Sequence, residues 1–186
     1  NRVGVVISGE GVTGNRIVRN SIFDNGGLGI DLVNGGNTEI ASPVLFSATA
    51  DADSTTIEGQ HNATFGRDYV VEIFSNSTCD GSGSGEGETF LVNISHTATD
   101  EFQEFSTVIE GVFPGDVITA TVTDVTDPPE DLMVNPADNT SEFSNCVNVS
   151  DQAPAPAPVL FGAVADATPE PSPSLGVAGL VDTGIE

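Results

Sequence analysis

Turn-forming residues interrupt this chain about every 8 to 12 residues, which is the spacing of short strands joined by tight turns. Between the Gly, Asn, Asp, Ser and Pro residues lie short runs rich in Val, Ile, Thr and Phe. The run DVITATVTD (residues 116–124) alternates apolar residues with threonine, as a strand with one buried face does. Apolar residues at helical spacing are hard to find, so the pattern predicts an all-β fold.

The largest region, residues 40–150, contains seven predicted strands. They cover residues 43–50, 54–60, 68–75, 88–95, 102–110, 116–124 and 141–149. Seven short strands in about 110 residues are typical of a two-sheet sandwich of the immunoglobulin or fibronectin type. A jelly roll or a barrel is the alternative.

A different pattern fills residues 1–37, where small groups of aliphatic residues alternate with Asn and Gly. The stretch GVVIS beginning at Gly4 returns as GIDLV beginning at Gly29, 25 residues later. This period predicts about one coil of a right-handed parallel β-helix, in which asparagines ladder at the bends. Two ordinary hairpins are the alternative. Such folds need about three repeats to bury their stacking faces, so we expect Asn1 to lie inside a longer helix.

The last region, residues 151–186, begins with the Pro-rich spacer QAPAPAP. The stretch PVLFGAVADA (158–167) then repeats PVLFSATADA (43–52) at eight of ten positions. A single strand is not stable alone, so we expect this one to complete a sheet, most simply in a neighbouring molecule. The start of a further module is the alternative. Its leading residues are Pro158, Val159, Leu160 and Phe161.

Charge is the unusual feature of the composition, since 28 acidic residues against four arginines and no lysine give a net charge of −24. Because so little here can neutralise phosphate, we expect no binding to nucleic acid. No run of 18 apolar residues occurs, so we expect no direct insertion into a membrane. Sequons for glycosylation favour an extracellular setting. Their asparagines are Asn62, Asn76, Asn93, Asn139 and Asn148.

Three stretches of the middle region resemble a module of large bacterial cell-surface proteins. They are STCDGSGSGEGETFL (77–91), DVITATVTD (116–124) and NTSEFSNC (139–146). In that family the module follows directly on right-handed parallel β-helix repeats, and the coil and the PVL opening found here fit the same arrangement. The resemblance implies an extracellular scaffold without known catalytic residues.

The two cysteines lie within these matched stretches. Cys79 follows the third predicted strand, and Cys146 lies toward the end of the seventh. In a seven-stranded sandwich these strands run in the same direction, so both cysteines lie toward one end. We therefore expect a disulfide, which would stabilise the fold by about 4 kcal/mol in the chain-entropy model. Two free buried thiols are the alternative.

Acidic residues gather at the predicted turns, and Ca²⁺ takes about six to eight oxygen ligands from loops of this kind. The candidate ligands are Asp51, Asp53, Asp80 and Glu86. Solvated carboxylates are the alternative. The stretch CDGSGSGEGE (79–88) lacks the ligand order of an EF-hand, and without a lysine or a following helix it is no phosphate loop. It is predicted to be a flexible, disulfide-tethered loop, and no cofactor other than Ca²⁺ is expected.

The two histidines, His61 and His96, fall beside predicted strand ends without another histidine at ligand spacing. We expect both to be exposed loop residues that bind no metal and form no catalytic triad.

These observations favour a structural or adhesive surface protein that is not an enzyme. Its partners would be neighbouring modules or further copies of itself, with the strand at 158–167 completing a neighbour's sheet in a filament. The alternative is a glycan-binding accessory module, or a fragment of a β-helical carbohydrate-active enzyme. Sugar-binding platforms usually need aromatic rings, and this chain has no tryptophan and one tyrosine.

Overall fold

The computed structural model describes residues 2–111, 115–126 and 138–151, and this part of the chain is all-β as predicted. The longer strands are β3 (Val44–Ala50), β4 (Ser54–Asn62), β5 (Asp68–Asn76), β6 (Thr89–Thr97), β7 (Phe102–Glu110) and β8 (Val117–Asp124). The shorter elements are β1 (Val5–Ser8), β2 (Ile30–Val33), η1 (Gly36–Glu39), β9 (Asn139–Thr140), β10 (Val147–Asn148) and β11 (Ser150–Asp151). None of the helices in the described ranges is long and apolar enough to cross a bilayer.

Two antiparallel sheets form a sandwich. The first, called the β8 sheet, has the order β10-β8-β5-β6 with β9 beside β8, and the second, called the β4 sheet, has the order β11-β3-β4-β7. The only parallel pair in these two sheets, within the described residues, joins β11 to β3. The first six predicted strands of the sandwich lie within two residues of β3 to β8.

The seventh predicted strand, residues 141–149, is wrong as a continuous strand. Residues 141–146 span the same length as only four residues of β8, 119–122, so two residues are extra. The chain absorbs them by hydrogen bonding through serine hydroxyls: Ser141 Oγ accepts the Val122 N–H at 3.0 Å, and Ser144 Oγ accepts the Ala120 N–H at 2.9 Å. After this double bulge the chain crosses from the β8 sheet at β10 to the β4 sheet at β11.

The core of the sandwich lies between the two sheets. The alternation of β8 is as predicted, because Ile118, Ala120 and Val122 are fully buried there. The threonines of the opposite face are buried as well, which the alternation alone does not predict. Thr119 donates its hydroxyl to the Glu86 carbonyl of the glycine-rich loop, and the hydroxyl of Thr123 lies 2.9 Å from that of Thr140.

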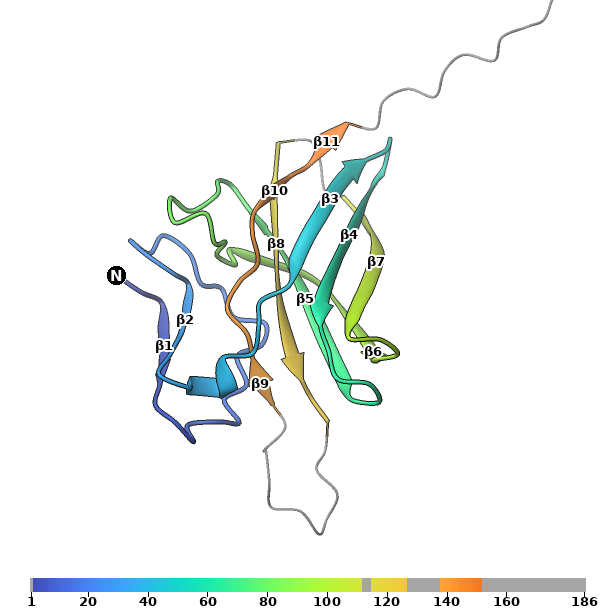
Figure 1. Ribbon diagram of the computed structural model, residues 1–186. Helices are drawn as coiled ribbons and strands as arrows, with labels where there is room; N and C mark the ends of the chain where they lie inside the picture. The colour runs from blue at the N-terminus through green and yellow to red at the C-terminus, as the bar shows by residue number, and fades with distance from the viewer. Residues whose placement is uncertain (1, 112–114, 127–137, 152–186) are drawn as a thin grey trace, which may run out of the picture. The chain divides into compact units, whose positions relative to one another are not determined.

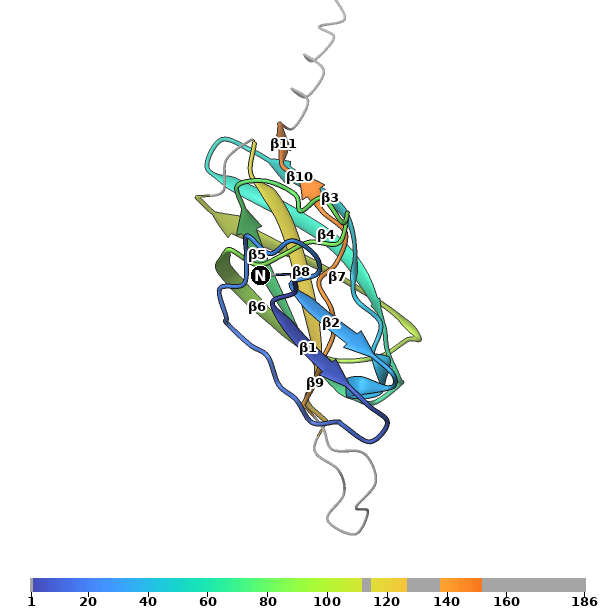
Figure 2. The same cartoon turned by 90° about the vertical axis from the view of Figure 1, so that its left-hand side faces the viewer.

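The N-terminal segment, residues 2–39, forms a third layer on the outer face of the β8 sheet. Its strands β1 and β2 pair in parallel with Val5 opposite Ile30, in register with the 25-residue repeat of the sequence. They lie on one side of β8 while β4 and β7 lie on the other (Figure 1), and the turned view shows them in front of β8 (Figure 2). A second apolar cluster, formed by Ile7, Ile30, Leu32, Phe74 and Phe143, joins this layer to the sandwich. All described residues therefore fall within one compact unit.

The predicted extra strand, 158–167, lies outside the described residues, as does most of the Pro-rich extension.

Candidate functional site: the junction between the N-terminal segment and the sandwich

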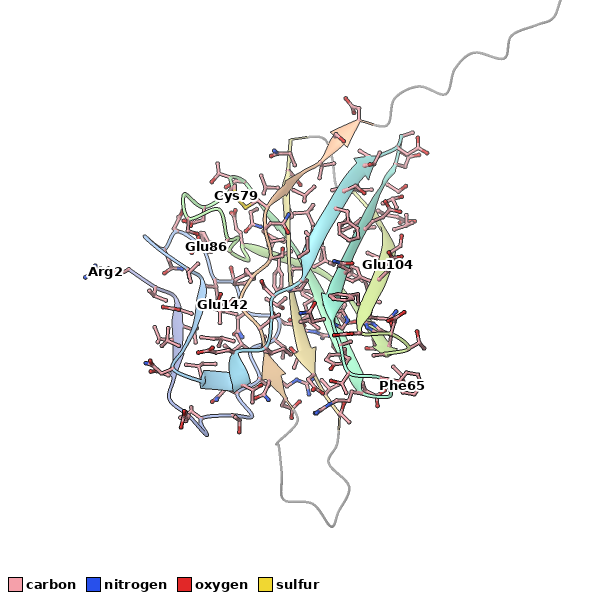
Figure 3. The ribbon with its side chains drawn as sticks, viewed as in Figure 1. Arg2, Phe65, Cys79, Glu86, Glu104 and Glu142 are labelled. Carbon is pink, nitrogen blue, oxygen red and sulfur yellow. A yellow bond between two sulfur atoms is a disulfide. The ribbon has the colours of Figure 1, made fainter. Side chains whose placement is uncertain are left out.

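Carboxylates of the sandwich bind the backbone of the N-terminal segment. In each of three contacts a glutamate oxygen accepts a backbone N–H: Glu72 from Arg19 at 3.0 Å, Glu86 from Asn25 at 3.1 Å and Glu142 from Leu32 at 2.8 Å. Glu86 and Glu142 lie between the β1–β2 layer and the sandwich (Figure 3). A buried N–H without an acceptor would be costly, so these three contacts fix how the segment lies on the β8 sheet.

Glu142 accepts a hydrogen bond from the edge of β2 that does not pair with β1. One edge of β2 pairs with β1, whereas Leu32 directs its N–H to Glu142 and not to β1. A further parallel strand would need this N–H as a donor. The carboxylate takes the place of that strand and covers an edge that would otherwise be open.

Glu72 is buried on the outer face of β5, with 1% of its surface exposed. Burial raises the pKa of this carboxyl, and the Arg19 N–H together with the positive charges of Arg19 and Arg16 oppose the shift only in part. The Arg19 guanidinium also lies 5.2 Å from the ring centre of Phe90. Because the segment covers Glu72, its carboxylate is placed to bind backbone and not a substrate.

Asn37 fixes the turn that leaves β2. Its side chain is fully buried and donates to the carbonyl oxygens of Asn15 at 2.8 Å and Thr140 at 3.0 Å. Its Oδ1 accepts from the side chain of Asn15 at 3.0 Å. Asparagine suits this position because its backbone is left-handed, with φ of 45°. Asn15 and Asn37 therefore form a side-chain pair at this turn.

The predicted disulfide is present in the structure. Cys79 and Cys146 are 67 residues apart in sequence, and their Cα atoms lie 5.9 Å apart. Since β8 is antiparallel to both β5 and β10, the strands beside the two cysteines run in the same direction, as expected. The bond ties the loop after β5 to the last part of the sandwich.

The glycine-rich loop was expected to be flexible, and its second half is not. Gly85 donates its N–H to the Ser144 carbonyl at 2.7 Å, and Gly87 exchanges two backbone hydrogen bonds with Ile22, each 2.7 Å long. A Cβ at Gly87 would lie 2.7 Å from the Phe143 ring. The glycines here permit close packing of the loop against the sandwich, which composition alone cannot distinguish from flexibility.

The four candidate calcium ligands lie in two loops, Asp51 and Asp53 in the turn after β3 and Asp80 and Glu86 in the loop between β5 and β6. Glu86 is bound to Asn25 through its backbone and its side chain, Asp80 accepts from the Ser82 N–H at 2.7 Å, and Asp51 accepts from the N–H of Ala52 at 2.7 Å. Asp53 is exposed in the turn between β3 and β4. In the described ranges no three His, Cys, Asp or Glu side chains form a group that could hold a metal ion. Calcium binding stays a prediction of the sequence alone.

The expectation that both histidines are exposed is wrong. His61 has 1% of its surface exposed, His96 is half-buried, and their Nε2 atoms lie 2.8 Å apart. The predicted strands ended at residues 60 and 95, whereas β4 and β6 continue two residues further and carry the histidines inward. Extending the alternation by one step is the signal that would have placed them.

The sequons divide by burial. Asn62, Asn93 and Asn148 are exposed, so glycosylation of these three stays a prediction. Asn76 and Asn139 are buried, and Asn76 donates to Thr119 Oγ1 at 3.0 Å. A glycan on either buried amide would not fit the folded protein, so the sequence pattern misleads at these two positions.

Comparison with known proteins gives no relative for this junction: no family model matches the chain, and no curated protein matches it.

Proposed function

We propose that this chain is an extracellular structural protein in which the N-terminal segment is the last coil of a right-handed parallel β-helix and the sandwich is its cap. The mechanism is mechanical and involves no turnover. The sandwich, of immunoglobulin-like type, closes one end of the coil stack and presents its acidic loops to neighbouring molecules.

The observation that carries the proposal is the contact between Glu142 and Leu32. In a stack of parallel coils, the edge of each rung is taken by the next rung. Here a side chain of the sandwich accepts the Leu32 N–H at 2.8 Å. The edge is therefore closed by a cap, and the parallel register of Val5 with Ile30 supports the coil on the other side of that edge.

Chemistry of the rest of the molecule supports an extracellular setting. A structural disulfide is typical of oxidising compartments. A net charge of −24 keeps such a protein soluble and repels anionic partners. Adhesion would then act through loops or sheet edges and not through a charged patch of the opposite sign.

Self-assembly is a second part of the proposal. The stretch at 158–167 repeats the sequence of residues 43–52, which contain β3, at eight of ten positions. A segment with the sequence of a sandwich strand has the side chains to pair in another copy of the same sheet. Electron microscopy of the full chain tests this part: filaments that disappear on deletion of 158–167 support it, and monomers before the deletion contradict it.

Force spectroscopy tests the cap directly. If the full chain is pulled by its two ends, the segment and the sandwich should unfold in one event, because they share an apolar cluster and three carboxylate contacts. Reduction of the disulfide should then release the 67-residue separation as roughly 230 Å of extra length.

The contrary result is an early, weak event that releases the first 37 or so residues while the sandwich stays folded. Such an event would show that the segment only rests on the sandwich, and it would overturn the cap.

A further inference from the structure

Two imidazoles meet inside the sandwich at the end opposite the disulfide. His61 lies on β4 and His96 on β6, so the 2.8 Å contact between their Nε2 atoms joins the two different sheets. Within the described residues, the hydrogen bonds of these imidazoles run only to each other and to the Asn62 carbonyl. The chain contains two histidines, so this pair is its entire complement.

The hydrogen bonds assign the tautomers. His61 Nδ1 lies 2.9 Å from the Asn62 carbonyl oxygen, which can only accept, so Nδ1 carries the proton. The Nε2 of neutral His61 is then an acceptor. His96 must therefore donate from its Nε2, and its Nδ1 is left as the free basic nitrogen of the pair.

The contact is a nearly straight N–H···N hydrogen bond. The ring centres lie 5.0 Å apart, and the two nitrogens lie 2.8 Å apart. The difference is about two ring radii, which is expected when both ring centres and both nitrogens lie nearly on one line. A metal ion placed on this line at about 2.0 to 2.1 Å from each nitrogen would need the nitrogens about 4 Å apart. With no third His, Cys, Asp or Glu grouped with them in the described part of the chain, the space between the rings suits a proton and not a metal.

In the described part of the chain, no carboxylate compensates a charge on this pair. Tyr69 from β5 contacts both rings, at 4.9 Å from His61 and 6.3 Å from His96, and it is neutral. Gln103 from β7 lies opposite His61 and is neutral as well. The charged groups of the surrounding elements are bound elsewhere or exposed. They are Asp68, which accepts from Thr97, the ion pair of Arg67 with Asp124 at 2.8 Å, and Asp100 and Glu101 in the turn between β6 and β7.

We propose that the His61–His96 pair is an acid-sensitive clasp between the two sheets. The first added proton enters at His96 Nδ1, because His96 lines a surface cavity of about 280 Å³ beside Tyr69 and Ser95. That step keeps the hydrogen bond and adds a charge to its donor. The second proton can add only to His61 Nε2, which is the acceptor of the hydrogen bond between the two imidazoles. Two imidazolium rings then face each other, and this end of the sandwich opens.

The direction of the pH dependence follows from the burial. Burial lowers the pKa of His61 and of His96, and the charge of His96 lowers the pKa of His61 further. The unfolded chain, in which a histidine titrates near about pH 6.5, therefore binds more protons than the folded chain below that pH. The stability that the neutral pair contributes is fully present above about pH 6.5 and is lost as the pH falls toward the folded values.

Nitrogen-detected NMR of the imidazoles in the full chain tests the clasp without any substitution. The spectrum at pH 7.5 with EDTA should show two different neutral tautomers, Nδ1–H for His61 and Nε2–H for His96. On acidification the two rings should titrate in separate steps, His96 first and both below about pH 6.5. Two rings of the same tautomer, or two rings that titrate together near 6.5, would overturn the proposal.

Thermal unfolding gives the second readout. Between pH 6.5 and 5.0, the Tm of the wild type should fall further than the Tm of His96→Gln. The expected extra fall is about 3 °C for each pH unit by which folding lowers the pKa values of the two histidines taken together. The variant keeps a side chain that can donate to His61 and removes one charge. Protection from hydrogen exchange should be lower at pH 5.0 than at pH 7.5 in the ends of β4 and β6 near residues 61 and 96, and should be unchanged beside Cys79. Parallel pH profiles for the two proteins, or uniform exchange along β4 and β6, would contradict the clasp.

Discussion

The hydroxyl of Ser144 accepts the backbone N–H of Ala120 at 2.9 Å, in the place where a paired strand would offer a carbonyl. Ser141 does the same for Val122 at 3.0 Å, and both serines are fully buried. The backbone N–H groups of the same serines complete each contact, at 2.8 Å to Ala120 and 2.9 Å to Val122. Serine is thus a backbone substitute in this strand, which explains how two extra residues fit without breaking the sheet.

Removing this acceptor should be strongly destabilising. Ser144→Ala leaves the buried Ala120 N–H without a partner, which costs about 1–3 kcal/mol in the free energy of unfolding. Urea denaturation measures the loss. The matched control is Ser106→Ala on the exposed face of β7, which should change stability by less than about 0.5 kcal/mol. Equal effects at the two serines would refute the role of the hydroxyl.

The junction makes a similar prediction. Glu142→Ala deprives the Leu32 N–H of its acceptor and should lower the free energy of unfolding by about 1–3 kcal/mol. Hydrogen exchange should also quicken at Leu32. The control is Glu104→Ala on the outer face of β7, which removes the same charge from an exposed position far from the junction (Figure 3). If Glu104→Ala is as damaging, net charge and not the contact controls stability.

Removing the buried charge of Glu72 should increase the stability of the protein in a pH-dependent way. Its pKa in the folded protein is raised by burial, so its contribution to stability is present below the unfolded value of about 4.3 and is lost as the pH rises through the folded value. Glu72→Gln keeps an oxygen for the Arg19 N–H and removes the buried charge. The variant should therefore be the more stable protein at pH 7, and the difference should vanish at acid pH. A less stable variant at pH 7 would show that the carboxylate charge helps to hold Arg19.

Two glycines of one loop should respond differently to the same change. Gly87→Ala places a Cβ 2.7 Å from the Phe143 ring, and such overpacking costs about 1–3 kcal/mol. Gly81→Ala meets nothing within 4 Å and should be close to neutral. Thermal unfolding of both variants measures the difference. Similar Tm values would mean that the second half of the loop yields easily.

Much of the fold could be predicted because alternation and turn residues are local. Strand β8 was placed within one residue, since DVITATVTD has one apolar face. The 25-residue repeat anticipated the parallel register of Val5 with Ile30, because these two residues hold equivalent positions in the repeat. The disulfide between Cys79 and Cys146, the two cysteines of the chain, was predicted from the direction of the strands beside them and from their place in the matched stretches.

The remainder depends on contacts between distant segments. Nothing near Ser144 in the sequence says that its hydroxyl replaces a carbonyl of a strand, because Ala120 is 24 residues away. A glycine-rich sequence predicts a flexible loop, and only the contact of distant Phe143 with Gly87 shows that the glycine is needed for close packing. The burial of the two histidines was not predicted, because the predicted strands ended two residues before the ends of β4 and β6 and so placed both histidines in loops. Short-range patterns place elements well, and they do not place what lies between elements.

The disulfide has a consequence for damage as well as for folding. Cys79 and Cys146 enclose more than a third of the chain, since they lie 67 positions apart in a sequence of 186 residues. A protease that cuts once anywhere between them leaves two fragments that stay covalently joined, so the molecule keeps its connection from one end to the other. Such a nicked chain would migrate as a single band on a gel until it is reduced.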